Sequence, residues 1–270
     1  MRINQNISAM NTYSRLTAAN NAKSSSLAKL SSGLRINKAG DDAAGLTISE
    51  KMRGQIGGLN QAVRNAQDGI SLIQTAEGAL NETHSILNRM RDLAVQAAND
   101  TNTNDDRTAI QQEVSELVKE IDRIADKTQF NTQALLNGTF SNKIIHIGAN
   151  SGETLSVSIK SMKASGLGVS GISVSTQTLA DDAISKIDSG IKKVSEERSK
   201  LGAYQNRLEH TINNLTTTSE NLTAAESRIR DVDMAEEMMK FTKNNILSQA
   251  ATSMLAQANQ MPQQVLQLLQ

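Results

Sequence analysis

An apolar residue recurs at every seventh position from Ile187 to Ile229, and a repeat of this length leaves few folds open. A straight α-helix drifts against a strict seven-residue repeat, so the pattern predicts a helix that supercoils against a partner helix. We therefore expect a long coiled-coil helix in the second half of the chain. Its seam residues are Ile187, Val194, Leu201, Leu208, Leu215, Leu222 and Ile229.

The partner helix is expected in the same chain, because a second ladder of equal length lies in the first half. Each ladder spans about 63 Å at the helical rise of about 1.5 Å per residue. Two equal rods on either side of a central region predict a chain that folds back on itself, with both termini at the same end. The second ladder consists of Met52, Leu59, Ala66, Ile73, Leu80, Leu87 and Ala94, with Ile56, Val63 and Ile70 at the adjoining seam position.

The second line of the later repeat is small or polar, and such residues would pack loosely between two helices. A third helix could cover them, a neighbouring subunit could cover them, or they could form a narrow, partly hydrated seam. The spacing does not choose among these arrangements. The line consists of Tyr204, Thr211, Thr218, Ala225 and Val232.

The two ends of the chain differ from its middle in charge. No acidic residue precedes Asp41, and no charged side chain follows Lys243. Few local salt bridges and little core predict terminal segments that are weakly stable alone, with simple fraying as the alternative. The N-terminal segment is expected to be a weak amphipathic helix with Ile3, Ile7, Met10, Leu16, Leu27, Leu30 and Leu34 on its apolar side. Near the C-terminus a displaced ladder comprises Leu247, Met254, Met261 and Leu268, and we expect Pro262 to end or kink that helix.

Helix boundaries in the middle of the chain are marked by polar residues. Thr47 and Glu50 form a capping-box pattern that predicts the start of the first rod. A polar cluster at residues 99–104 is expected to end that rod, and Asp105 and Asp106 favour a new helix.

A β-hairpin is expected between residues 130 and 160, where apolar residues alternate with polar ones around an Asn-Ser-Gly turn. Residues 160–178 are rich in Ser and Gly and predict a loop, after which Asp181 and Asp182 open the second rod. The predicted fold class is mainly α: a long antiparallel helical coiled-coil bundle with a small β-hairpin region.

No pattern in the chain predicts catalysis, a cofactor or a metal site. Gly166, Gly168 and Gly171 match a dinucleotide-binding pattern, but no strand precedes them and no helix opens on them, so we expect a flexible loop. The three histidines lack ligand spacing. The acidic run from Asp231 to Glu237 is interpreted as a solvated helix face rather than a cation site.

Composition excludes further classes of protein. The chain has no cysteine, so disulfides and thiolate chemistry are excluded, and its net charge of zero gives no case for nucleic-acid binding. The sequence predicts no transmembrane segment and no secretory signal peptide, so export would need a different route.

Four runs make the chain resemble bacterial flagellin over essentially its whole length. They are SSGLRINKAGDDAAGLTISEKMRGQI at 31–56, DGISLIQTAEGAL at 68–80, LGAYQNRLEHTINNL at 201–215 and LAQANQMPQQVLQLLQ at 255–270. Together these four runs are highly specific for that family.

The resemblance implies a cofactor-free, extracellular subunit that polymerises into the flagellar filament for swimming motility. It implies residues 1–44 and 236–270 as inner-tube segments and residues 45–235 as the outer-tube domain. The variable outer domains of larger flagellins are expected to be absent, because only a short connection joins Ile159 to Leu179. The implied partners are further copies of the chain, the flagellar export apparatus, an export chaperone, the filament cap and the hook-junction proteins, with no nucleic acid and no membrane.

The resemblance also implies two sites for other proteins. A vertebrate Toll-like receptor is expected to contact Arg89, Leu93 and Glu113. An export chaperone and a cytosolic immune sensor are expected to use the C-terminal apolar residues Val265, Leu266, Leu268 and Leu269. All of these residues can instead serve packing between subunits. The alternative identities are a hook–filament junction protein and a soluble helical scaffold.

Overall fold

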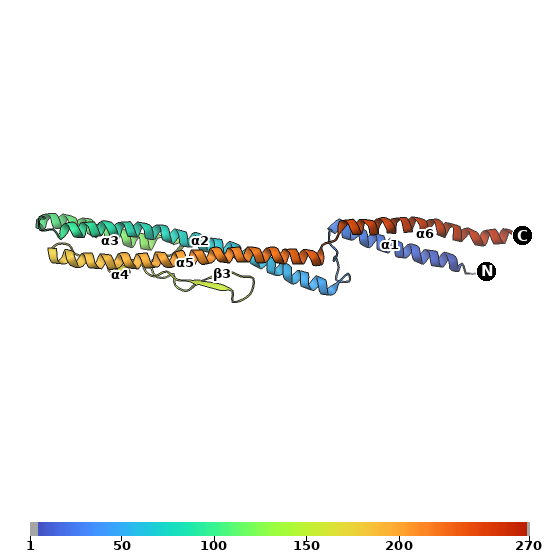
Figure 1. Ribbon diagram of the computed structural model, residues 1–270, viewed down its shortest axis with the longest axis horizontal. Helices are drawn as coiled ribbons and strands as arrows, with labels where there is room; N and C mark the ends of the chain where they lie inside the picture. The colour runs from blue at the N-terminus through green and yellow to red at the C-terminus, as the bar shows by residue number, and fades with distance from the viewer. Residues whose placement is uncertain (1–4, 269–270) are drawn as a thin grey trace. The chain divides into compact units, whose positions relative to one another are not determined.

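The computed structural model describes residues 5–268, and their side chains as far as residue 261. The chain is mainly α, with two small antiparallel hairpins (Figure 1), which confirms the predicted fold class. In order, the elements are α1 (Ile7–Ser32), α2 (Ala43–Ala97), α3 (Asn104–Lys127), β1 (Gln129–Phe130), β2 (Gln133–Ala134), β3 (Lys143–His146), β4 (Thr154–Val157), α4 (Ala164–Leu167), α5 (Gln177–Arg230) and α6 (Met234–Leu268).

The chain divides into two compact units whose boundaries fall inside the long helices α2 and α5. The central unit runs from Gln55 to Ser219. The terminal unit consists of the residues up to Gly54 and those from Glu220 onward. The family resemblance implied boundaries at 44/45 and 235/236. The central unit is therefore shorter than expected, by about ten residues at its start and about sixteen at its end.

The core of the central unit is a continuous heptad seam along α2. Leu59, Ala66, Ile73, Leu80, Leu87 and Ala94 are all buried, and so is a second line three residues after each of them. That second line consists of Ala62, Gly69, Ala76, Thr83, Met90 and Ala97.

The expected adjoining line, Ile56, Val63 and Ile70, is only half-buried and flanks the seam. The closely packed line leaves too little space for a large side chain at Gly69. A Cβ on Gly69 would lie 2.7 Å from the Ile145 Cδ1 of the hairpin and 3.4 Å from the Leu208 Cδ1 of α5. Small residues therefore occupy most of the closely packed line, in which Met90 is the one long side chain, and Ile56, Val63 and Ile70 lie at its edge.

In α5 the seam is buried from Ile187 to Leu215, whereas Leu222 and Ile229 in the terminal unit are half-buried. Upstream of Leu201 its second line is covered by the segment after β4, which includes the short helix α4. Gly190 lies against Val169, and the Glu197 carboxylate accepts the Lys160 amide at 3.3 Å. Beyond Leu201 this cover ends: Tyr204 and Thr211 are half-buried and Thr218 is exposed.

The expectation of a flexible loop at Gly166 to Gly171 was wrong. The segment after β4 contains the short helix α4 and packs against the core through Met162, Ala164, Leu167, Val169, Ile172 and Val174, all buried. A Cβ on Gly166 would lie 2.5 Å from the Ser161 carbonyl oxygen, so that glycine allows a close backbone approach.

Two helix starts differ from the capping patterns in the sequence. Helix α2 begins at Ala43, because the Asp42 carboxylate accepts the Gly45 amide at 2.8 Å. Thr47 lies inside the helix, with its hydroxyl donating to the Ala43 carbonyl, so the predicted capping box is wrong. Helix α5 begins at Gln177, one turn before Asp181.

The break between α2 and α3 lies where the polar cluster predicted it. Thr103 and Asp106 form a reciprocal capping box, and the hydrogen bonds from Thr103 lower the pKa of the Asp106 carboxyl below its ordinary value. The buried Arg107 guanidinium donates to the Ala97 carbonyl at 3.0 Å and to the Asn99 carbonyl at 3.2 Å. It thereby satisfies carbonyls at the C-terminal end of α2.

The predicted hairpin is present as β3 and β4, paired antiparallel from Lys143↔Val157 to His146↔Thr154. Leu155 and Val157 face the core, and the Asn65 amide of α2 donates to the His146 carbonyl at 3.0 Å. A second, smaller hairpin of β1 and β2 turns through Asn131 and Thr132, both with positive φ. This hairpin was not predicted from the sequence.

Candidate assembly surface

The terminal unit is built on an antiparallel pair of helices, α1 and α6, that lie side by side along their length (Figure 1). Polar side chains form hydrogen bonds between the two helices. Lys23 Nζ donates to Asn245 Oδ1 at 2.9 Å, and Ser248 Oγ donates to Asn20 Oδ1 at 2.8 Å. Nearer the chain ends, Asn6 Nδ2 donates to the Ala258 carbonyl at 2.7 Å. Of the side chains described in these two helices, only Ser26, Glu237 and Ala258 are buried, so the pair buries little apolar area of its own.

The connections from α1 to α2 and from α5 to α6 are joined by backbone hydrogen bonds. The Arg35 amide donates to the Arg230 carbonyl at 2.7 Å, and the Val232 amide donates to the Gly33 carbonyl at 3.0 Å. Gly33 has φ of 72°, which ends α1 in the left-handed region that glycine tolerates. This antiparallel bridge lies directly after the end of α1 and directly before the start of α6.

The terminal unit contains almost no apolar core of its own. Among its described residues, only Ile36 and Ala258 are buried apolar side chains other than glycine. Leu16, Leu30, Phe241 and Leu255 of the helix pair are half-buried, and the exposed large apolar side chains of the unit are more numerous. The exposed ones are Ile7, Met10, Tyr13, Leu27, Ile48, Met234, Met238, Met239, Ile246, Leu247, Met254 and Met261.

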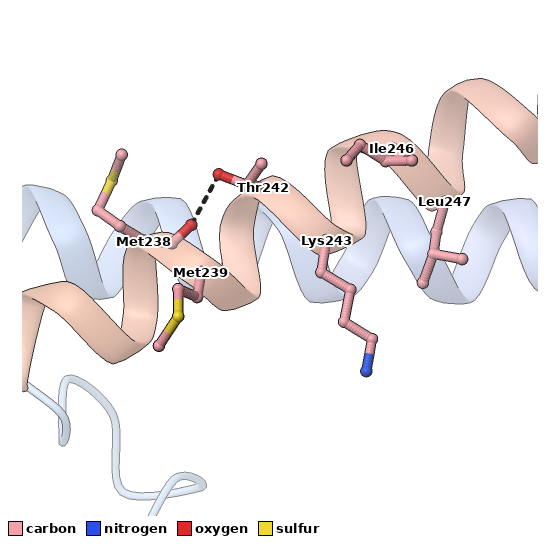
Figure 2. A pocket seen from close by; sticks show the side chains of 6 residues that line it. All are labelled: Met238, Met239, Thr242, Lys243, Ile246 and Leu247. Atoms are coloured by element: carbon pink, nitrogen blue, oxygen red, sulfur yellow. Dashed lines mark hydrogen bonds between the residues drawn. The ribbon is translucent and has the colours of Figure 1, made fainter.

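An apolar hollow on α6 gathers several of these side chains. It is lined by Met238, Met239, Thr242, Lys243, Ile246 and Leu247, all from this helix (Figure 2). Met239 is 67% exposed and Ile246 60% exposed. We call this patch the α6 hollow. Uncovered apolar side chains gathered in this way are typical of a surface that another protein covers.

The side chains expected on the assembly surface fall mostly on this outward face. Ile7, Leu27, Leu247, Met254 and Met261 are exposed, and Leu30 is half-buried. Ile3 and Leu269 lie outside the described residues, as do the side chains of Val265, Leu266 and Leu268. Pro262 does not end the helix, since α6 continues to Leu268.

Sequence reasoning missed Met238, Met239 and Ile246. The sequence does contain a pattern that indicates one helix face here, because Met238, Thr242 and Ile246 follow one another at four-residue steps in a stretch with few charges. The seven-residue ladder predicted Leu247, Met254 and Met261 instead.

The three residues implied for receptor contact are not equally accessible. Arg89 on α2 and Glu113 on α3 form an exposed ion pair, with Nη2 of Arg89 2.8 Å from Oε1 of Glu113. Leu93 lies one turn further along α2 but is only 2% exposed, within the core of the central unit. The structure therefore brings the two charged residues together at the surface and gives Leu93 a packing role.

The acidic run before and within α6 is used locally. Asp233 caps α6 by accepting the amides of Ala235 and Glu236 at 2.9 and 3.1 Å, and Glu236 pairs with Lys240 at 2.8 Å. Across residues 5–268, no cluster of His, Cys, Asp and Glu has the arrangement of a metal site. Over the same described part of the chain, no helix is long and apolar enough to cross a membrane.

Comparison with known protein families finds two matches that together cover most of the chain. The profile of the bacterial flagellin N-terminal helical region matches residues 3–141, and that of the bacterial flagellin C-terminal helical region matches residues 184–269.

Curated relatives match over the whole of both chains. The chain is 58% identical to a flagellin of Halalkalibacterium halodurans over 271 residues and 55% identical to a flagellin of Bacillus subtilis over 304 residues, each covering 100% of both proteins. A flagellar filament core protein of Brachyspira hyodysenteriae is 52% identical over 285 residues, again with full coverage of both.

Solved structures show the same fold. The crystal structure of Bacillus cereus flagellin is 37% identical and covers 60% of this chain and 94% of its own, with a TM-score of 0.52. A protein described as a flagellar hook-associated protein from Vibrio parahaemolyticus covers 71% of this chain and 100% of its own at a TM-score of 0.60, but at 14% identity that likeness concerns the fold alone.

Proposed function

This chain belongs to the bacterial flagellin family, and from that premise we propose how its two units divide the work of a filament subunit. The chain is a structural protein of the extracellular bacterial flagellar filament, in keeping with relatives named flagellin and flagellar filament core protein. Identities above 50% over full length favour this function over a hook–filament junction protein or a soluble scaffold.

The central unit supplies the stability of the free subunit. Its heptad seam buries aliphatic side chains over the length from Leu59 to Ala97 and from Ala180 to Leu215. Each fully buried Leu or Ile contributes roughly 1.5 to 3 kcal/mol relative to an exposed one. We assign this unit to the outer tube of the filament, where its exterior also packs against neighbouring subunits.

The terminal unit supplies the contacts that hold subunits together in the inner tube. The single observation that supports this assignment is the scarcity of buried apolar side chains in the α1–α6 pair: hydrogen bonds between polar side chains join the two helices, and most of their large apolar residues are exposed. Such a pair gains little from folding alone and much from being covered, because burial of apolar area is the dominant favourable term in association. The terminal helices are therefore expected to become stably ordered only on assembly.

Export and assembly require partners besides other copies of the chain. We assign export in an unfolded state to the flagellum-specific apparatus, with a chaperone on Val265, Leu266, Leu268 and Leu269 and without a cleaved signal peptide. The absence of cysteine and the single proline in the sequence favour this route, since neither disulfides nor slow prolyl isomers would arise during passage. The filament cap and the hook-junction proteins are the remaining proposed partners.

Recognition by a vertebrate Toll-like receptor is proposed at the Arg89–Glu113 ion pair. Both side chains are accessible, 56% and 46% exposed, and an arginine at a protein surface often contributes strongly to binding. Leu93 then acts by holding α2 in place rather than by touching the receptor. Filaments are expected to be weak ligands, because this face packs against neighbouring subunits.

The assembly assignment is tested by adding a charge to the α6 hollow. Leu247→Asp should stop seeded elongation of filaments, because an unpaired carboxylate would have to be buried on docking. It should leave the melting temperature of the free subunit nearly unchanged, since Leu247 is 47% exposed. Leu247→Met keeps an apolar side chain of similar volume and serves as the matched control, which should elongate seeds at the parental rate. Elongation of seeds by the Leu247→Asp protein at that rate would overturn the assignment.

A further inference from the structure

The methionines among residues 5–261 differ in exposure between the two units. The central unit contains Met90 and Met162, which are 0% and 3% exposed. In the described part of the terminal unit, Met52 is half-buried and all the other methionines are exposed. Those exposed residues are Met10, Met234, Met238, Met239, Met254 and Met261.

This distribution matters because a methionine thioether reacts with peroxides according to its access to solvent. The sulfur attacks one oxygen of hydrogen peroxide, the O–O bond breaks, and the sulfur is oxidised by two electrons to a sulfoxide while the other oxygen leaves as water. The product replaces a flexible apolar side chain with a polar, chiral one. Enzymes of the methionine sulfoxide reductase class reverse the change.

Met238 and Met239 stand apart from the other exposed methionines because they line the α6 hollow together. They lie one turn before Thr242 and Lys243 and two turns before Ile246 and Leu247 (Figure 2). In this view one hydrogen bond joins lining residues: the Thr242 hydroxyl donates to the Met238 carbonyl at 2.9 Å. The hydroxyl proton is therefore not free to bond a sulfoxide oxygen.

We propose that Met238 and Met239 form an oxidation site that controls entry of the subunit into the filament. Peroxide oxidises them in the free subunit, and the sulfoxide oxygens then oppose burial of the α6 hollow against a second copy of the chain. Once the hollow is covered in the filament, the same two sulfurs are protected. This inference rests on the proposed role of the α6 hollow in assembly.

The expected size of the effect follows from burying a polar group without a partner. A sulfoxide oxygen left without a donor at the subunit contact should raise the critical subunit concentration for elongation by about 5- to 150-fold, equivalent to roughly 1 to 3 kcal/mol. Because the oxidation is reversible, treatment with a sulfoxide reductase should restore the original value.

The experiment treats the full-length free subunit with hydrogen peroxide, maps the sulfoxides by mass spectrometry and measures elongation from untreated seeds. Met238 and Met239 should be oxidised before Met90 and Met162, which serve as internal controls within the same molecule. Elongation should fall as the two α6 sulfurs are oxidised. Subunits treated after incorporation into filaments should keep both thioethers.

Two double variants separate these methionines from the others. Met238→Leu with Met239→Leu should elongate after peroxide treatment, whereas Met238→Gln with Met239→Gln should elongate poorly without any peroxide. The proposal is overturned if the treated parental protein elongates normally with both residues oxidised, if the Leu variant loses elongation as the parent does, or if the Gln variant elongates at the parental rate. Failure of the untreated parental subunit to elongate seeds would instead refute the proposed assembly function.

Discussion

Truncation of Leu201 to alanine tests whether the heptad seam holds the free subunit together. Leu201 is 0% exposed and belongs to the continuous core of the central unit. Removing a fully buried leucine side chain leaves a cavity and costs roughly 3 to 5 kcal/mol, the upper part of the range for such substitutions. In a unit of this size that loss corresponds to a fall of about 6 to 20 °C in melting temperature.

Leu222→Ala is the matched control, because Leu222 occupies the same heptad position three repeats later but is half-buried and lies in the terminal unit. Its truncation should cost about 1 kcal/mol or less, in proportion to the smaller apolar area it buries. Differential scanning calorimetry on dilute free subunit measures both variants beside the parent. Equal falls in melting temperature for the two variants, or no fall for Leu201→Ala, would refute the division of stability between the units.

Three further predictions concern other parts of the central unit. Asp106 has a pKa below the ordinary 3.8, so its capping contribution is present at neutral pH and lost as the pH falls through the folded-state pKa; the destabilisation by Asp106→Asn in urea titrations should therefore shrink below about pH 4. Gly166→Ala should destabilise because its Cβ meets the Ser161 carbonyl, whereas Gly78→Ala, at an open helical position, should stabilise by about 0.5 to 1 kcal/mol in the same titrations. Arg89→Ala should cost under about 1 kcal/mol of stability, since its ion pair is exposed, yet weaken receptor signalling by the free subunit in a reporter-cell assay.

The long helices could be predicted from the sequence because a seven-residue repeat is a property of the chain alone. The repeat through Leu201 and that through Leu80 indicate rods whatever else surrounds them. The hairpin of β3 and β4 likewise follows from local alternation around a turn. These signals need no knowledge of which residues meet in space.

The residues of the second seam line could not be predicted in this way. Gly69 and Ala76 are buried because other elements approach them closely, and hydrophobicity alone pointed to Val63 and Ile70 instead. The segment after β4 was missed for the same reason: it has no regular period, and its burial depends on Val169 meeting Gly190 across the fold. Close packing between distant parts of the chain leaves no periodic trace in the sequence.

The sequence indicated only part of what the structure shows in the terminal unit. The scarcity of acidic residues and the displaced ladder through Leu247 predicted weak terminal helices, but not which of their apolar residues would be exposed. That exposure depends on which faces of α1 and α6 meet, as in the pairing of Asn20 with Ser248 and of Lys23 with Asn245, and this is not a property of either helix alone. The family resemblance implied Leu93 as a receptor contact, whereas its burial shows that it packs in the core.

Hydrogen exchange in the free subunit and in the filament tests the division between folding and assembly most directly. Exchange rates should be slow along the seams of α2 and α5 in both states, because the central unit holds its own core. Along α1 and α6 they should be fast in dilute free subunit and slow in the filament, because covering the outward apolar residues stabilises these helices. Equally slow exchange of α1 and α6 in the dilute free subunit would contradict the account, since the terminal helices would then be stable without assembly.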